Sequence, residues 1–323
     1  MQERIFVQIA SYRDPQLGAT LHDLIAKAIH PERLHIGICL QLDRSDGASC
    51  GPATLPSGPG LRGAQLRLDL VPASQSGGVC WARARSQRLW CREPFTLQID
   101  SHMRFAPAWD RELLACWRRC NDTRAVLSVY PNAFELPDVC DTATLPVMAA
   151  LRFDDQGLLR LQGISRYRHP EERPPQPLAS ALVAAGLLFG PGELITAAPY
   201  DPELYFDGEE ISLALRLWTR GFNFYNPDRL LIFHLYKRVN EANITHWADH
   251  ADWGERNSHA IARVLALTNG SNLPAPYGLG TMRTLQQYQQ WSGIDFVNRQ
   301  ISAEALAGQF TPPPPASDAA VAG

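Results

Sequence analysis

The stretch IFVQIASYRDPQLGATLHDLIAKAIHPERLHIGICLQ, residues 5–41, decides the fold class of this chain. It begins with an apolar, β-rich run over residues 5–10 and ends with a second such run over 35–41. Between the two runs, apolar residues recur at the spacing of one helix face: Leu21, Leu24, Ile25, Ala28 and Ile29. His30-Pro31 ends that helix, because proline disfavours helical geometry in the residue before it. Strand, helix and strand within about forty residues predict a parallel sheet with crossover helices.

The rest of the chain continues this alternation. Further strands are expected at residues 66–71, 95–99, 125–131, 181–190 and 229–237. Further helices are expected within 76–90, 109–117, 211–218, 247–266 and 281–292. Residues 137–178 are interpreted as long connections with a hairpin at 151–163. We therefore predict an α/β fold: a central, mostly parallel sheet flanked by helices in a domain over 1–240, a C-terminal helical extension over 241–309, and a disordered Pro/Ala-rich tail over 310–323.

The composition excludes several classes of protein. The 323 residues carry 30 Lys and Arg against 33 Asp and Glu, so no strong field attracts nucleic acid or an anionic membrane. No apolar run is long enough to cross a bilayer, and MQERIFVQIASYRD lacks the features of a signal peptide, so we expect a cytoplasmic protein. The seven cysteines are an odd number in a chain with no export signal, so they are expected to be reduced and mostly buried. A zinc site at Cys116 and Cys120 is not expected, because no second ligand pair accompanies them.

The motif LQIDSHMRF, residues 97–105, places a carboxylate and an imidazole where an apolar strand ends. If the extended geometry continues, Asp100 and His102 point to the same side, at the edge where open α/β sheets bind ligands. Oxygen and imidazole ligands suit Mn²⁺ better than Ca²⁺, and so few protein ligands leave coordination positions for substrate phosphates. The alternative is structural, with Asp100 capping the following turn and His102 hydrogen-bonded at the surface.

Five blocks in register add a family resemblance. The blocks are residues 5–41, GVCWARARSQRLW (78–90), LQIDSHMRF (97–105), LYFDGEEISLALRLWTRGFNFYNP (204–227) and LLIFHLYKR (230–238). Together they resemble the GlcNAc-transferase family, whose eukaryotic members attach N-acetylglucosamine to hydroxyproline on a cytoplasmic protein. The Asp-x-His element is similar, more distantly, to that of polypeptide GalNAc-transferases. The resemblance covers roughly residues 4–240.

The resemblance implies a GT-A-type nucleotide-sugar-binding fold with its catalytic domain over 1–240. It also implies Mn²⁺ or another divalent cation, UDP-GlcNAc as the donor, and transfer with retention of configuration to a hydroxyl group of a protein or glycan. By position, Asp100 and His102 would bind the metal, which would bridge the diphosphate of UDP. His234 matches the third metal ligand of the related transferases; taken alone, it is an ordinary histidine of an apolar strand.

Other matched residues are expected to bind the nucleotide. Tyr12, Arg13 and Asp14 end the first strand, where this fold holds uracil and ribose; the alternative is a simple turn before Pro15. Arg83 follows a glycine pair near a helix start, where arginine and free backbone N–H groups favour phosphate oxygens. Arg238, close after His234, would steady the diphosphate. Both arginines have a solvated surface role as the alternative.

The acidic run Asp207-Gly208-Glu209-Glu210 supplies the catalytic candidates. Glu209 matches an acidic residue that binds sugar hydroxyls near the reacting carbon in related enzymes, and Glu210 stands where GalNAc-transferases have an amide. The acids also suit a helix N-terminus. A double displacement requires a nucleophilic carboxylate, for which Glu209 and Asp207 are candidates; the alternative is attack from the face that UDP leaves.

Two other functions use the same residues. One is a metal-dependent hydrolase of nucleotide-sugar diphosphates, and the other is a catalytically inactive nucleotide- or glycan-binding module. The sequence leaves open the acceptor, the oligomeric state, and the roles of residues 132–180 and 241–323.

Overall fold

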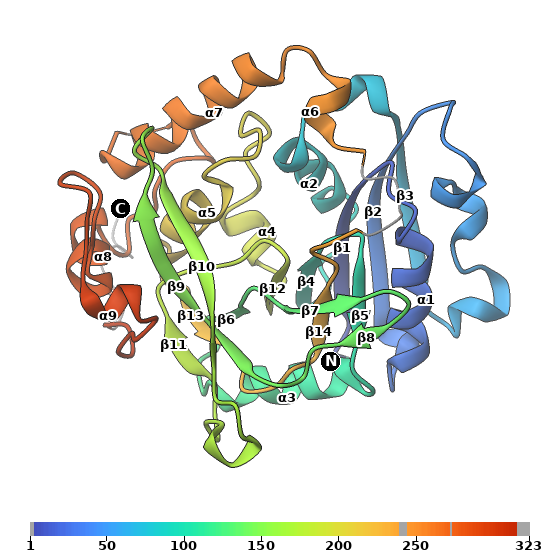
Figure 1. Ribbon diagram of the computed structural model, residues 1–323, viewed down its shortest axis with the longest axis horizontal. Helices are drawn as coiled ribbons and strands as arrows, with labels where there is room; N and C mark the ends of the chain where they lie inside the picture. Colours follow the sequence, from blue (N-terminus) through green and yellow to red (C-terminus); the bar gives the residue numbers. More distant parts are fainter. Residues whose placement is uncertain (1–2, 239–243, 272, 315–323) are drawn as a thin grey trace.

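The computed structural model describes residues 3–238, 244–271 and 273–314 (Figure 1). Its centre is an eight-stranded sheet with the order β11-β13-β6-β12-β4-β1-β2-β3. The strands are β1 (Ile5–Tyr12), β2 (Leu34–Leu42), β3 (Gln65–Pro72), β4 (Phe95–Ile99), β6 (Ala125–Ser128), β11 (Leu178–Ser180), β12 (Leu187–Pro191) and β13 (Asn223–Asn226). The pairs β1–β2, β2–β3, β1–β4 and β6–β13 are parallel. The predicted α/β fold with a mostly parallel sheet is confirmed. Two strands are exceptions: β11 runs antiparallel to β13, and β12 runs antiparallel to both β4 and β6.

Helices and smaller sheets surround this centre. The helices are α1 (Leu17–Lys27), α2 (Val79–Gln87), α3 (Trp109–Arg119), α4 (Leu194–Ala197), α5 (Glu209–Trp218), α6 (His246–Asp249), α7 (Trp253–Thr268), α8 (Leu285–Ser292) and α9 (Ala303–Leu306). A four-stranded sheet has the order β5-β14-β7-β8, formed by β5 (Met103–Phe105), β14 (Ile232–His234), β7 (Asn132–Glu135) and β8 (Val139–Cys140). Two hairpins are formed by β9 (Leu145–Phe153) with β10 (Leu159–Arg166), and by β15 (Ile294–Asp295) with β16 (Gln300–Ile301). No helix among the described residues has the length and apolar character needed to cross a membrane.

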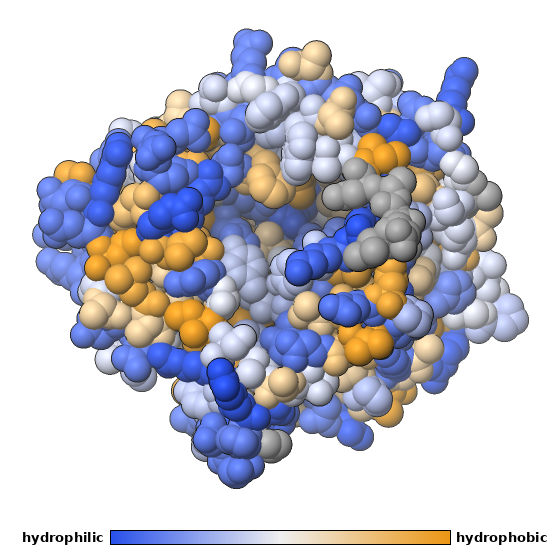
Figure 2. Space-filling model, viewed as in Figure 1, coloured by the Kyte–Doolittle hydropathy of each residue, from blue (hydrophilic) through white to orange (hydrophobic). Residues whose placement is uncertain are grey.

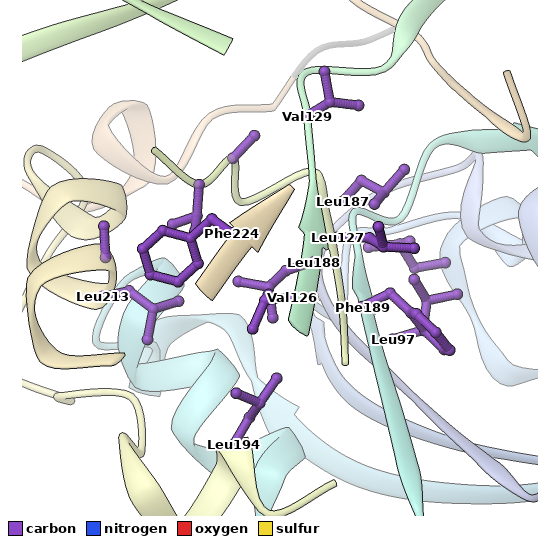
Figure 3. Close-up of a cluster of buried hydrophobic side chains, with 14 of the residues drawn as sticks. Leu97, Val126, Leu127, Val129, Leu187, Leu188, Phe189, Leu194, Leu213 and Phe224 are labelled. Carbon is purple, nitrogen blue, oxygen red and sulfur yellow. The ribbon is translucent and has the colours of Figure 1, made fainter. Parts of the chain in front are cut away.

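One continuous apolar core joins the strands of the central sheet to the helices. Figure 3 shows Leu97 of β4, Val126 of β6 and Phe189 of β12 in this core, with Leu213 of α5 and Phe224 of β13 beside them. Burying each such side chain contributes about 1.5–3 kcal/mol relative to leaving it exposed. The C-terminal helices join the same core through Ala260, Val264, Tyr288 and Ala305. The boundary at residue 240 stays a prediction.

Several element boundaries differ from the sequence expectations. Helix α1 ends at Lys27 because the carboxylate of Asp110 accepts the N–H groups of Ile29 and His30, both at 2.8 Å. The strand expected over 229–237 is only the three-residue β14, and it belongs to the small sheet. The strand expected over 181–190 is the shorter β12.

The hairpin expected at residues 151–163 is present and is longer than expected, with β9 over Leu145–Phe153 and β10 over Leu159–Arg166. Strands β9 and β10 pair antiparallel, with a register shift at residues 160–161. In Figure 1 this hairpin crosses in front of the β13 side of the central sheet. At the chain end, residues 310–314 belong to no helix or strand, and the prediction of disorder for 315–323 falls outside the described residues. The seven cysteines are free thiols, as predicted.

Candidate functional site

A cleft of about 700 Å³ opens at the carboxyl ends of β1, β4 and β6. It appears in Figure 2 as the hollow at the centre of the face shown. Nine of the ten site residues proposed from the sequence line it: Tyr12, Asp14, Arg83, Asp100, His102, Asp207, Glu209, His234 and Arg238. Arg13 is the exception. The structure therefore brings together residues from five separate segments, as expected of a site built at one sheet edge.

Asp100, His102 and His234 form a compact group at the floor of this cleft. The sequence had suggested that the extended geometry of the strand continues through Asp100 and His102. In the structure β4 ends at Ile99 and the chain bends through residues 100–102, so no strand holds these two residues. The pairing of β5 with β14 sets Met103 opposite His234, and this brings His234 beside His102. One ligand atom from each of the three residues lies within 4.8 Å of the other two.

The surroundings of this group fit a divalent cation. His234 Nε2 lies 3.3 Å from Asp100 Oδ2, while His234 Nδ1 is buried without a hydrogen-bond partner among the described residues. Gly186 faces the group, and a Cβ there would lie 3.3 Å from Asp100 Oδ2. One carboxylate and two imidazoles suit Mn²⁺ or Zn²⁺ better than calcium.

Asp14 joins His102 to the segment that follows His234. Its Oδ2 accepts from Ser101 Oγ at 2.6 Å and from Arg238 Nη2 at 2.8 Å, and it pairs with His102 Nδ1 at 2.7 Å. Its Oδ1 accepts from Arg238 Nη1 at 2.9 Å. Burial opposes ionisation, but the hydrogen bonds from His102 and Arg238 outweigh it and hold the pKa of Asp14 well below its usual range. The carboxylate therefore fixes His102 with Nδ1 inward, which leaves Nε2 for an ion. These contacts hold Asp14 against His102 and Arg238, and contact of Asp14 with uracil or ribose stays a prediction.

Arg83 performs a similar task for Asp100. Its Nη2 donates to Asp100 Oδ1 at 2.8 Å, and its Nη1 donates to Glu209 Oε1. Burial opposes the charge on Asp100, yet the hydrogen bond with His234 and the charge of Arg83 keep the pKa of Asp100 well below its ordinary value. Arg83 is only 3% exposed, so it is a buried link between two acids rather than the surface residue that was the alternative.

The start of α5 holds the three acids of the DGEE run in different surroundings. Gly208 has φ +79°, and a Cβ there would lie 2.7 Å from Val264 Cγ2, so α7 packs directly against this turn. Asp207 accepts from Arg160 on β10 and from Asn257 on α7. Glu209 points to Arg83.

Glu210 has a third environment, with only neutral donors. Its Oε1 accepts from the Ala185 N–H at 2.8 Å, and its Oε2 accepts from the Tyr130 hydroxyl. Burial raises the pKa of Glu210 to about 7.

Tyr12 and Arg13 anchor α6 beside the cleft. The Tyr12 hydroxyl and Arg13 Nη1 both donate to Asp249 Oδ2 at 2.7 Å, and Arg13 Nε donates to Asp46 at 2.8 Å. Tyr12 also lines a side pocket of about 130 Å³, together with Gln41, Tyr205 and His246. Arg13 thus ties α6 to the end of β1, and nucleotide binding by Arg13 stays a prediction.

Several residues that line the cleft were not predicted from the sequence. Tyr130 lies two residues beyond the end of β6, and it had been included in the strand expected over 125–131. The sequence gives no functional signal at Gly186 or at residues 159–161 of β10. A single glycine and an ordinary strand pattern do not indicate which part of the molecule they contact. Phe206 and Trp247 complete the wall near α6; their rings meet edge to face, with ring centres 5.8 Å apart.

Comparison with known proteins supports the fold and the family. The sequence matches the family model described as "Glycosyltransferase (GlcNAc)" over residues 4–57 and 57–298. No curated protein matches. The structure is similar to that of GalNAc-T7 with UDP, GalNAc and Mn²⁺, at 12% identity and a TM-score of 0.55, over 89% of this chain and 54% of that one. The chain thus spans about half of the GalNAc-T7 chain, and the likeness confirms the predicted GT-A-type fold.

Two further solved structures are less similar. The mannosyltransferase PcManGT from Pyrobaculum calidifontis, with GDP-Man and Mn²⁺, has a TM-score of 0.49 and 12% identity over 85% of this chain and 66% of that one. TarS from S. aureus has the same score and identity over 93% of this chain and 44% of that one.

Proposed function

Because the chain belongs to the glycosyltransferase (GlcNAc) family, we propose that it is a metal-dependent, retaining transferase that moves N-acetylglucosamine from UDP-GlcNAc to a hydroxyl group of a protein or glycan. The observation that carries this proposal is the group of Asp100, His102 and His234 at the floor of the cleft. The family description supports the GlcNAc donor, and the UDP and Mn²⁺ bound by GalNAc-T7 support the nucleotide and the ion.

The three ligands would hold Mn²⁺ or a similar divalent cation, whose charge would stabilise the diphosphate as a leaving group. Arg83 keeps Asp100 ionised and oriented. Asp14 holds His102 in the required tautomer and also positions Arg238, whose guanidinium lies at the cleft and adds positive charge for the diphosphate. The metal site is therefore held in place before any ligand binds, which is the condition for strong electrostatic stabilisation.

Retention without a covalent intermediate is the route that the ion pairs favour. Glu209 and Asp207, the two nucleophile candidates, are bound to Arg83 and Arg160. A carboxylate held by an arginine is a weaker nucleophile, because its charge is already neutralised. We therefore assign Glu209 to binding sugar hydroxyls through the face not taken by Arg83, and Asp207 to holding the hairpin against α7. The acceptor would attack from the face that UDP leaves.

For the nucleotide, we propose that Tyr12 lies against the base at the side pocket. That pocket adjoins the cleft, since Tyr12 and His246 line both. The Tyr12 ring is already oriented by its bond to Asp249 and by the His246 ring, whose centre lies 4.9 Å away.

A donor screen tests the proposal. UDP release is measured with UDP-GlcNAc, UDP-GalNAc and UDP-glucose in the presence of Mn²⁺, followed by mass spectrometry of glycosylated components of a cell lysate. We expect UDP-GlcNAc to be preferred, EDTA to abolish release, and Asp100→Ala to abolish it while the exposed-site control Asp155→Ala does not. Undiminished release by Asp100→Ala at saturating Mn²⁺ would contradict the proposal; UDP release that no acceptor increases would indicate a hydrolase instead.

A further inference from the structure

Five carboxylates from three segments of the chain line the cleft, and four of them are paired with arginines. Asp14 pairs with Arg238, Asp100 and Glu209 pair with Arg83, and Asp207 pairs with Arg160. Glu210 is different: within residues 3–238, 244–271 and 273–314 it has no arginine or lysine partner. Glu210 is therefore the one acid of these five that has no ion pair with an arginine among the described residues.

Glu210 is nevertheless held firmly. The Ala185 N–H donates to Oε1 at 2.8 Å, and the Tyr130 hydroxyl donates to Oε2. These donors fix both oxygens on opposite sides of the carboxyl group without cancelling its negative charge. Each oxygen keeps a lone pair for a further contact. Such a group is pre-oriented to meet positive charge that a substrate brings.

The position of Glu210 relative to the metal group indicates which part of the donor it meets. Ala185 precedes Gly186, whose Cβ position would lie 3.3 Å from Asp100 Oδ2 and 3.8 Å from His234 Cδ2. The diphosphate is expected over that metal group, and the first carbon of the sugar is bonded to the diphosphate. A sugar bonded to a diphosphate in that place would have its first carbon near the wall formed by Glu210, Ala185 and Gly186.

We propose that Glu210 is a catalytic carboxylate that faces the reacting carbon of the donor sugar and stabilises the positive charge that develops there, an assignment that rests on the proposed transferase function. No bond to Glu210 forms. The C1–O bond breaks and its electron pair leaves with UDP, while the acceptor oxygen bonds to C1 and its proton passes to the departing diphosphate. A fixed, pre-oriented negative charge stabilises such a transition state without reorganisation.

The test is Glu210→Gln, which keeps the shape and removes the charge. We expect kcat to fall by about 10²-fold or more, in the range found when one electrostatic contact to a transition state is removed. The dissociation constants for Mn²⁺ and UDP should stay within about threefold of wild type, because the contact acts only in the transition state. The matched control is Glu255→Gln at an exposed position of α7, which should leave kcat unchanged.

A second variant separates this role from a structural one. The titratable and charged groups near Glu210 are Tyr130, Tyr236, Glu209 and Arg83. Tyr130→Phe removes a hydrogen bond that favours the ionised carboxylate, so the acid limb of the kcat–pH profile should move to higher pH. In Glu210→Gln that limb should be lost.

Three outcomes would overturn the inference alone, and a fourth would overturn the proposed function. A kcat for Glu210→Gln within about threefold of wild type would overturn the inference. Loss of Mn²⁺ and UDP binding in parallel with the loss of kcat would also overturn it, because such a parallel loss indicates a structural role. An unchanged acid limb in both variants would also overturn it. Failure of the wild-type protein to release UDP from any UDP-sugar would instead overturn the proposed function, and this inference with it.

Discussion

The substitution Asp14→Asn tests how the metal site is held. The carboxylate of Asp14 pairs with His102 Nδ1 at 2.7 Å and accepts two hydrogen bonds from Arg238. The amide of asparagine has the same size but only one acceptor oxygen. Either His102 therefore loses the partner that fixes its tautomer, or Arg238 loses one of its two hydrogen bonds to residue 14. Arg238, with its charge no longer balanced, then lies close to the cation and repels it.

The magnitude follows from the behaviour of such supporting carboxylates. Loss of a residue that orients a metal-bound histidine costs about 10- to 100-fold in metal affinity. This corresponds to about 1.4–2.7 kcal/mol of binding free energy. Ser101→Ala removes one hydrogen bond to Asp14 and leaves the contact with His102, so its effect on affinity should be smaller.

The assay is Mn²⁺ binding, by calorimetry or by the electron paramagnetic resonance signal of free Mn²⁺, with Asp155→Asn as the exposed control. Circular dichroism establishes that each variant is folded. A folded Asp14→Asn protein that binds Mn²⁺ within about threefold of wild type would refute the reasoning that this carboxylate supports the metal ligand.

Three other predictions follow from single contacts. Gly186→Ala places a Cβ 3.3 Å from Asp100 Oδ2, so the affinity for Mn²⁺, measured by the same titration, should fall. An unchanged affinity would contradict the close packing of Gly186 against Asp100. Gly208→Ala puts a side chain at a residue with φ +79° and its Cβ 2.7 Å from Val264, so the free energy of unfolding measured in urea should fall by about 1–2 kcal/mol or more. A free energy of unfolding equal to that of wild type would contradict the packing of α7 against this turn. Burial lowers the pKa of His246 to about 4, so its protonation favours the unfolded state. Its contribution to stability is complete above pH 6.5, the ordinary histidine pKa, and is lost as the pH falls from there to about 4. His246→Gln should therefore lose less stability than wild type between these pH values, and parallel curves for the two proteins would argue against this burial effect.

The first part of the fold was predictable because it depends on local patterns. The β1–α1–β2 unit is encoded by two apolar runs and one helical stripe, and its strands pair in parallel as expected. The helix end at Lys27 was not predictable, since Asp110, from a distant segment, accepts the N–H groups of Ile29 and His30. The antiparallel insertion of β12 between β4 and β6 is likewise a tertiary choice that no local pattern contains.

The site was predictable to the extent that its residues follow strands. Asp100 and His102 stand directly after β4, and the sheet edge explains why they meet. His234 was selected by resemblance alone, because the pairing of β14 with β5 joins segments more than one hundred residues apart. The contacts of Asp14 with His102 and Arg238, and the absence of an arginine beside Glu210 among the described residues, depend on side-chain geometry that periodicity and spacing do not encode.

Crystals soaked with UDP and Mn²⁺ provide the most direct measurement of the central claim. Anomalous scattering at the manganese edge locates the ion independently of any assumption about its ligands. We expect one peak at about 2.2 Å from the carboxylate of Asp100 and from an imidazole nitrogen of His102 and of His234, with the diphosphate on its open side. A peak elsewhere in the chain, or ordered UDP in the cleft with no ion between it and these three side chains, would contradict the account.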